Sequence, residues 1–198
     1  MNAIPFTLLM TSVAETAAAS AEQLNARLDR LLPLLADGGT AELEQIYAET
    51  KSLVYGFALS ILKNPHSAED VMQDTYVRLV QAAASYTPQG KPMAWILTIV
   101  RRLALMRLRR GDTAPSDTLE EWIAAPGDFT EDSLDRLVLQ AALITLSEGE
   151  REIVMLHALS GLKHREIADL MELPLSTVLS KYRRALKKLR TIYEEESA

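Results

Sequence analysis

The sequence predicts an all-α protein made of two small helical domains joined by an acidic linker. Apolar residues recur at helical spacings of three and four through most of the 198 residues, and no stretch keeps the alternating pattern of a strand. Residues 112–135 contain eight acidic residues, two prolines and no Lys or Arg, a composition typical of a linker. Apolar residues make up 48% of the chain, enough to bury a core on each side of that linker.

Four helices are expected before the linker, over residues 20–35, 41–62, 67–86 and 93–110. The first carries leucines on one face, namely Leu24, Leu28, Leu31 and Leu35, and Pro33 interrupts its last turn. Ser67 is expected to be the N-cap of the third helix, with Asp70 completing an approximate capping box. The fourth helix begins apolar and ends strongly basic, after a loop over residues 87–92.

Four more helices are expected after the linker, over residues 134–146, 147–161, 163–171 and 174–195. Ala168 and Val178 stand ten residues apart around a turn, the spacing at which a helix-turn-helix packs a small residue on a branched one. Glu172 occupies a turn position where glycine is usual, so a left-handed backbone there would cost about 1 kcal/mol. The second helix of the motif is expected to bury Val178, Tyr182, Ala185, Leu186 and Leu189 and to leave outward Thr177, Ser180, Lys181, Arg184 and Lys188.

The positive charge is concentrated at two helix ends, although the chain has a formal net charge of -6. The first cluster is Arg101, Arg102, Arg107, Arg109 and Arg110, and the second is Lys181, Arg183, Arg184, Lys187, Lys188 and Arg190. Such clusters bind a phosphate backbone by releasing its counterions, whatever the net charge of the rest of the protein. The alternative is a pair of solvated helix ends whose cations complement the helix dipole.

Several classes of function are disfavoured by the composition. The chain has no cysteine, and its three histidines, His66, His157 and His164, are scattered without metal-binding spacing, so we expect no metal or cofactor and interpret His157 as a hydrogen-bonded core residue. There is no phosphate-binding glycine loop and no pairing of nucleophile and base, so no catalytic residue is expected. No apolar run is long enough to insert into a membrane, and the N-terminus lacks a basic leader region. We expect a cytoplasmic protein. A secretory signal is the lesser alternative, because the N-terminal segment contains small residues of the kind found at signal-peptide cleavage sites.

Motifs on the two sides of the acidic linker, in a fixed order, carry a resemblance to a known family. "AEDVMQDTYVRLVQA" and "MAWILTIVRRLALMRLRR" precede the acidic linker, and "ITLSEGEREIVMLHALSGLKHREIADLMELPLSTVLSKYRRALKKLR" follows it. Together they resemble the extracytoplasmic function (ECF) sigma factors, the small two-domain branch of the sigma-70 family. The resemblance covers residues 41–193 and implies a transcription initiation factor.

The resemblance also implies a division of the chain. Residues 41–110 would be sigma region 2, which binds the clamp helices of core RNA polymerase, melts the promoter and recognises the minus-ten element. Residues 136–193 would be region 4, whose helix-turn-helix binds the minus-thirty-five element. The linker, 111–135, would thread the RNA exit path of the polymerase, the alternative being a solvated tether. Residues 1–40 are an extension outside the minimal family pattern, whose leucine stripe either packs on region 2 or docks a regulator.

Three sets of site residues follow from the resemblance. The polymerase-binding residues would be Glu69, Asp70, Gln73 and Asp74. The residues for the minus-ten element and melting would be Tyr86, Trp95, Arg101, Arg102, Arg109 and Arg110. The residues for the minus-thirty-five element would be Thr177, Ser180, Lys181, Arg183, Arg184, Lys187 and Lys188. The alternatives are that Tyr86 caps the preceding helix against the core and that Trp95 is a core residue.

The chain departs from the family pattern at three positions in these helices. Arg102 stands where asparagine is common, Met106 where aspartate is frequent, and Leu179 where a basic residue is frequent. The expected partners are core RNA polymerase, promoter DNA and an anti-sigma factor, with the free protein a monomer. A dimeric stand-alone helix-turn-helix regulator with an N-terminal sensing domain is the first alternative, and a helical enzyme or metal-binding protein is the second. The acidic segment "AEDVMQD" favours the sigma factor, because a regulator needs no face for a polymerase clamp.

Overall fold

The computed structural model describes residues 6–111 and 145–196, with side chains from 19 to 111 and from 145 to 192, and every element in these ranges is helical, as predicted. The chain divides into two compact units, Met1–Glu22 with Phe129–Ala198 and Gln23–Asp128. The acidic residues expected to form the linker, 112–135, lie outside the described residues. Most of the helix expected over 134–146 lies outside them too.

The first helix, α1 (Phe6–Ala36), begins much earlier than the leucine spacing predicted. No glycine or proline precedes Pro33 within it, and its first half is rich in alanine, the strongest helix former. The buried stripe is Leu24, Leu28, Leu32 and Leu35, whereas Leu31 is only half-buried. The helix continues through Pro33, which is exposed and near the C-terminal end, where losing one backbone hydrogen bond costs little.

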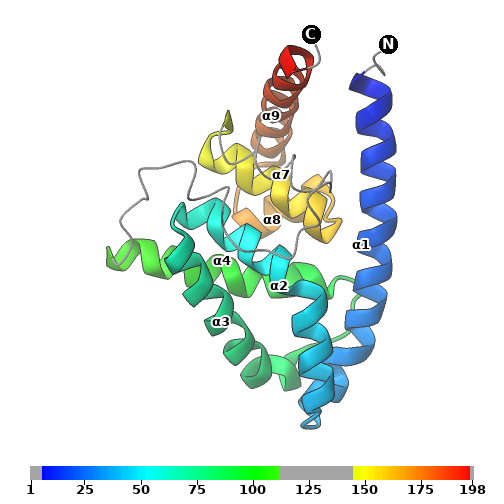
Figure 1. Ribbon diagram of the computed structural model, residues 1–198, viewed down its shortest axis with the longest axis vertical. Helices are drawn as coiled ribbons and strands as arrows, with labels where there is room; N and C mark the ends of the chain where they lie inside the picture. The colour runs from blue at the N-terminus through cyan, green and yellow to red at the C-terminus, as the bar shows by residue number, and fades with distance from the viewer. Residues whose placement is uncertain (1–5, 112–144, 197–198) are drawn as a thin grey trace. The chain divides into compact units, whose positions relative to one another are not determined.

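The unit Gln23–Asp128 is a helical bundle. Its helices after α1 are α2 (Thr40–Leu62), α3 (Pro65–Ala82), the short 3₁₀ helix η1 (Ala83–Ser85) and α4 (Pro92–Arg110). Helices α2, α3 and α4 pack against one another in pairs (Figure 1). Their fully buried side chains include Phe57, Leu59, Leu79, Met93, Ile96 and Leu97. The second half of α1 belongs to this unit, with the leucines of its stripe buried and Arg27 Nε bonded to Glu49 of α2 at 2.8 Å, an arrangement that favours the packing interpretation of the leucine stripe.

The start of α3 differs from the prediction. Asn64, not Ser67, is the N-cap, and its side-chain oxygen accepts a hydrogen bond from the Ser67 backbone N–H at 2.8 Å. Pro65 takes the first helical position, where its fixed φ suits the helix and its missing N–H costs nothing. Ser67 is therefore a buried residue of the first turn, and the Asp70 carboxylate has a different partner, described below.

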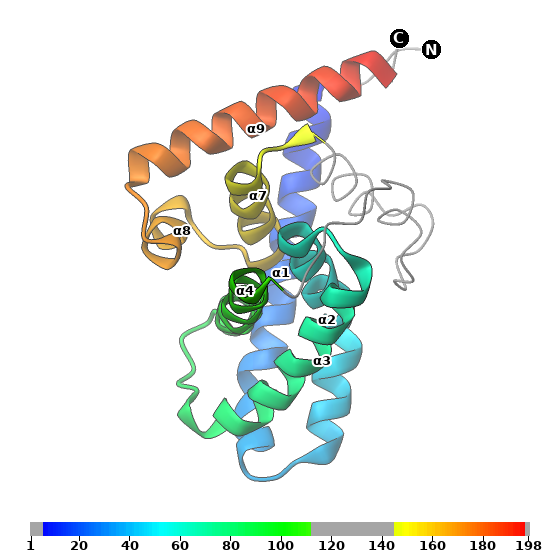
Figure 2. The same ribbon diagram turned by 90° about the vertical axis from the view of Figure 1, so that its left-hand side faces the viewer.

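The other unit contains a helix-turn-helix. Its described helices are α7 (Glu148–Ser160), α8 (His164–Met171) and α9 (Leu175–Glu196), and a short turn joins α8 to α9 (Figure 2). In that turn Glu172 has φ 55° and ψ 41°, the left-handed conformation expected there, and Leu173 N–H bonds to Ala168 O at 2.9 Å. Ala168 and Val178 are both buried, as the helix-turn-helix spacing predicts. The helix α9 packs on α7 through a cluster of Leu146, Val154, Ala185 and Leu189, with Tyr182 beside it.

Candidate nucleic-acid interface

The helix α9 presents a cationic face opposite its buried side. Val178, Ala185 and Leu189 turn toward the core of the unit, and the residues on the far side are all exposed: Ser176, Ser180, Arg183, Arg184, Lys187 and Arg190. No acidic residue lies between Leu175 and Ile192. Hydroxyls and cations on one exposed helix face are the groups that bind phosphates and base edges in a DNA groove.

The predicted outward set on α9 is only partly exposed. Ser180 and Arg184 are exposed, but Thr177, Lys181 and Lys188 are half-buried. Lys181 and Lys188 lie along the edge of α9 that faces the start of α7, where the Lys181 ammonium lies beside Gly149. The centre of the exposed face is therefore Arg183 and Lys187. Residue spacing locates the apolar side of a helix, but the position of α7 decides which flanking cations it covers.

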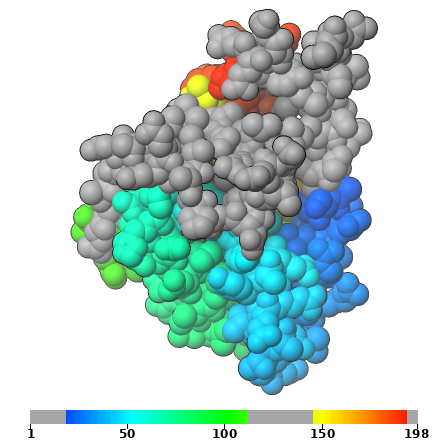
Figure 3. Space-filling view, in the orientation of Figure 1, coloured from blue at the N-terminus to red at the C-terminus, as the bar shows by residue number. Residues whose placement is uncertain are grey.

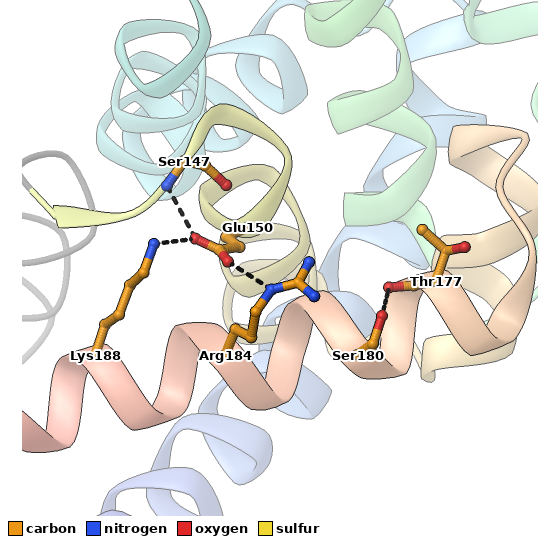
Figure 4. A network of polar contacts seen from close by, with 6 residues as sticks. All are labelled: Ser147, Glu150, Thr177, Ser180, Arg184 and Lys188. Carbon is orange, nitrogen blue, oxygen red and sulfur yellow. Dashed lines mark hydrogen bonds and ion pairs between the residues drawn. The ribbon is translucent and has the colours of Figure 1, made fainter.

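Two of these cations are held by one buried carboxylate, Glu150 of α7 (Figure 4). Its side chain is 4% exposed, Arg184 Nε donates to its Oε1 at 3.2 Å, and Lys188 Nζ donates to its Oε2 at 2.7 Å. The same carboxylate accepts from the Ser147 backbone N–H at 3.0 Å, which closes the capping box of α7. Sequence analysis missed Glu150. Its only local signal is the Ser-x-x-Glu spacing of that box.

The electrostatics of Glu150 follow from these contacts. Burial by itself raises the pKa of a carboxyl group, but hydrogen bonds from Lys188, from Ser147 and from Arg184 outweigh it and lower the pKa of Glu150 to about 2. Glu150 is therefore ionised at every physiological pH. It orients two cations of α9 and fixes α9 against α7, while Arg184 stays exposed at the surface.

A cluster of three rings joins α7 to the two helices of the helix-turn-helix. His157 and His164 stack with centroids 4.8 Å apart, and both meet the Tyr182 ring edge-on, at 5.2 and 4.4 Å. His157 Nδ1 bonds to the Leu162 carbonyl at 2.7 Å, so it is hydrogen-bonded as predicted, but it is half-buried and not a core residue. Burial and the nearby His157 lower the pKa of His164. Across residues 6–111 and 145–196, no three His, Cys, Asp or Glu side chains gather as metal ligands would.

In the other unit, α4 carries the second candidate surface. Met93, Leu97, Val100 and Ala104 form its buried side. At helical spacing on the opposite side lie Trp95, Arg102, Met106 and Arg109, of which Trp95 is half-buried and the other three are exposed. Of the remaining predicted arginines, Arg110 is exposed and Arg101 is half-buried. Trp95 therefore shares a face with Arg102 and Arg109 and is not part of the fully buried core.

The loop before α4 is organised around Tyr86. The Tyr86 ring packs on Trp95 with centroids 4.9 Å apart and planes at 50°, and its hydroxyl donates a short hydrogen bond to Asp29 of α1. Burial raises the pKa of Tyr86, and the hydrogen bond to Asp29 and the negative charge of Asp29 raise it further. Tyr86 is thus half-buried and held from two sides. Its partial exposure suits a ring that stacks on a base, and its fixed contacts suit a ring that caps the preceding helix against the core.

Helix α3 contributes an exposed face that mixes acidic and apolar groups. Glu69, Gln73 and Asp74 are exposed, and beside them lie two valines, Val77 at 57% and Val80 at 45% exposure. Figure 3 shows the surface of α2 and α3 in cyan to green. Asp70 has an internal role instead, because Arg107 of α4 donates to its carboxylate at 2.5 Å. Sequence analysis assigned Asp70 to a partner and did not foresee Arg107.

Comparisons with known proteins agree with this arrangement. The family models for Sigma-70 region 2 and for Sigma-70, region 4 match residues 46–113 and 136–189. A relative named ECF RNA polymerase sigma factor SigK, from Mycolicibacterium vanbaalenii, is 30% identical over 192 residues, which cover 92% of this chain and 97% of that protein. The protein of the same name from Mycobacterium tuberculosis is 27% identical over 182 residues, covering 85% of this chain and 94% of its own.

Two solved structures share the fold. CnrH, in complex with the cytosolic domain of CnrY, has a TM-score of 0.58 at 21% identity and covers 85% of this chain and 98% of its own. The sigma factor RpoE from Bartonella quintana, in complex with the anti-sigma factor NepR, has a TM-score of 0.58 at 22% identity and covers 76% of this chain and 96% of its own. Within residues 6–111 and 145–196, no helix has the length and apolar character to span a membrane. The chain belongs to the ECF sigma factors of the sigma-70 family.

Proposed function

We propose that this protein is a transcription initiation factor that binds core RNA polymerase and directs it to specific promoters. The observation that carries the proposal is the presence of regions 2 and 4 in one chain, each with an exposed face suited to a different partner. The relatives named above are called RNA polymerase sigma factors. The proposal takes the chain to supply binding surfaces and to leave catalysis to the polymerase, with which it would act in the cytoplasm.

The polymerase-binding surface of the proposal is the exposed face of α3. Glu69, Gln73 and Asp74 offer acidic and polar groups to basic clamp helices, and Val77 and Val80 offer apolar area beside them. Asp70 lies at the edge of this surface, since its side chain is 34% exposed and its carboxylate is already paired with Arg107.

The minus-thirty-five element would be bound by the exposed face of α9. Ser180, Arg183, Arg184 and Lys187 point away from the core, and Thr177, Lys181 and Lys188 flank them. Because Glu150 orients Arg184, that guanidinium is a candidate for a base contact that needs fixed geometry. Lys187 is free to follow the phosphates, as long lysine side chains commonly do.

The minus-ten element would be opened and bound by α4 and the loop before it. An unpaired base is captured by stacking on a flat side chain while polar groups bind its edge or backbone. The Tyr86 and Trp95 rings pack together, and Arg102 and Arg109 continue the same face of α4. Arg101 and Arg110 would add phosphate contacts at its flanks.

The proposal includes an anti-sigma factor as a further partner. The solved structures of CnrH and of RpoE hold these proteins in complex with CnrY and with the anti-sigma factor NepR. An inhibitor of this kind would cover the faces of α3 and α4 and so block polymerase and promoter together. The proposal takes the free protein to be a monomer.

The decisive experiment is run-off transcription with purified core polymerase, with and without the protein, on a set of genomic promoter fragments. We expect specific transcripts only when the protein is present. Tight binding to one DNA fragment by a dimer without polymerase, and no transcript with polymerase, would instead identify a stand-alone helix-turn-helix regulator.

A further inference from the structure

Helix α1 makes two side-chain contacts with the segment that leads into α4. Asn25 Oδ1 accepts a hydrogen bond from the Met93 backbone N–H at 3.1 Å, and the Asp29 carboxylate accepts one from the Tyr86 hydroxyl. Asn25 and Asp29 are four residues apart and so lie on the same face of α1. Between their two targets lie the loop residues 87–91, most of which are exposed.

The contact made by Asn25 caps the start of α4. The first N–H groups of a helix need acceptors, and the N-cap residue of α4, Lys91, gives no side-chain cap. The side-chain oxygen of Asn25 serves the Met93 N–H in its place, from 68 residues away in the chain. Asn25 is 7% exposed and Met93 is fully buried, so solvent does not offer an easy replacement.

The contact made by Asp29 fixes the aromatic ring of Tyr86. Its carboxylate accepts a hydrogen bond from the hydroxyl end of Tyr86. The ring itself packs on Trp95. The loop, residues 87–91, is therefore held to α1 from both sides, through Tyr86 before it and through Met93 after it.

We propose that Asn25 and Asp29 are positioning residues for promoter opening, which hold the loop and the Tyr86–Trp95 ring pair in the geometry that receives an unpaired base. This inference rests on the proposed function and assigns α1 a part in it. A loop that is already ordered spends less of the interaction energy on its own immobilisation when a base arrives. The contacts need not touch DNA, because they act through Tyr86 and through the start of α4.

The test measures the rate of open-complex formation by holoenzyme on duplex promoter and on the same promoter with a pre-melted bubble. Asp29→Ala and Tyr86→Phe remove opposite ends of one hydrogen bond, and Asn25→Ala removes the cap. We expect each to slow opening of the duplex roughly three- to tenfold, the range expected for one hydrogen bond of this kind. The double variant of Asp29 and Tyr86 should be no slower than either single one, and the bubble should restore the rate.

The matched control is Arg27→Gln, on the same helix. It breaks the ion pair that ties α1 to Glu49 of α2 and leaves the loop contacts in place, so opening should stay at the wild-type rate. Thermal unfolding and binding of a duplex minus-thirty-five probe are measured for every variant. For Asp29→Ala and Tyr86→Phe, probe binding should stay unchanged, and the melting temperature should fall by no more than the loss of one hydrogen bond explains.

Three results would overturn the inference: equal slowing on the bubble, equal slowing by Arg27→Gln, or wild-type opening by all three loop variants. The proposed function fails by a different result, the absence of any transcript with the wild-type protein. Transcription by the wild type, with opening unaffected by the α1 variants, leaves the proposed function standing and removes only the role of α1.

Discussion

The Glu150 carboxylate, at the start of α7, accepts a 3.2 Å hydrogen bond from Arg184 Nε, in the middle of α9. This bond joins α7 to the helix that we propose binds DNA, within the unit that holds α7, α8 and α9, called the C-terminal unit below. Because the carboxylate is buried and also bonds Lys188, one residue adds polar contacts to the apolar packing of α9 on α7 and orients two of its cations.

Glu150→Gln should destabilise the C-terminal unit, because it removes the charge from a site built around a carboxylate. We expect a loss of about 1–2 kcal/mol in unfolding free energy at neutral pH, less than the pKa shift alone implies because both cations are partly exposed. The folded-state pKa, about 2, lies below the ordinary value of 4.5, so the contribution is present above 4.5 and is lost as pH falls toward 2.

Denaturation of wild type and variant across this pH range, with hydrogen exchange of α9 as a local probe, checks this prediction. Glu148→Gln is the matched control, since Glu148 lies in the same first turn but is exposed. A variant as stable as wild type at pH 7, or a difference that persists at pH 2, would contradict it.

His164 should make the helix-turn-helix less stable in mild acid. Its pKa is lowered in the folded state, so the unfolded chain binds the proton more readily, and stability falls as pH drops below about 6.5. His164→Phe keeps a ring against Tyr182 and should flatten the dependence of the melting temperature on pH between about 7.5 and 5.5. His66→Gln, which changes an exposed histidine on α3, should leave the slope unchanged. The same slope in all three proteins would refute the assignment to His164.

Glu172→Gly should stabilise the C-terminal unit, since glycine adopts the left-handed turn conformation without steric cost. The expected gain is up to about 1 kcal/mol, reduced by the greater freedom of glycine in the unfolded chain. Urea denaturation measures it, and Glu172→Ala, which keeps a Cβ atom, should bring no gain. A loss of stability in the glycine variant would mean that the Glu172 side chain makes a contact worth more than the strain.

Charge reversal on the face of α3 should weaken binding to core polymerase. Glu69→Lys with Asp74→Lys changes two exposed side chains, so we expect an unchanged melting temperature and at least about a tenfold loss of affinity at low salt. Asp70→Lys is the contrasting variant, because it breaks the pair with Arg107 and should lower the melting temperature. Wild-type affinity in the double variant would show that this face does not bind the polymerase.

Two substitutions on α9 should separate base contacts from phosphate contacts. Arg184→Ala should cost about 1–3 kcal/mol on the preferred minus-thirty-five sequence and much less on a scrambled one. Lys187→Ala should weaken binding to both sequences alike and reduce the slope of log affinity against log salt by about 0.9. Fluorescence anisotropy over a salt series measures both quantities, and identical losses on both sequences for Arg184→Ala would mean that Arg184 does not discriminate bases.

The helices and the helix-turn-helix were predictable because their information is local. Apolar spacing along α9 set Val178, Ala185 and Leu189 on its buried side, and the Glu-Leu-Pro turn implied the left-handed Glu172. The same spacing, together with the two motifs, was enough to indicate the fold class and the family. Where local cues competed, as at Asn64 and Ser67, the Asn-Pro pair was the stronger start signal and was overlooked.

The contacts that organise the candidate sites join residues far apart in the chain. Glu150 and Arg184 are 34 residues apart, Asp70 and Arg107 are 37 apart, and Asn25 and Met93 are 68 apart. Periodicity shows which side of a helix is apolar, but not which helix packs against it or which polar groups meet at the edge of that contact. Those pairings depend on the packing of whole helices, so only the tertiary structure decides which cations are held and which remain at the surface for a partner.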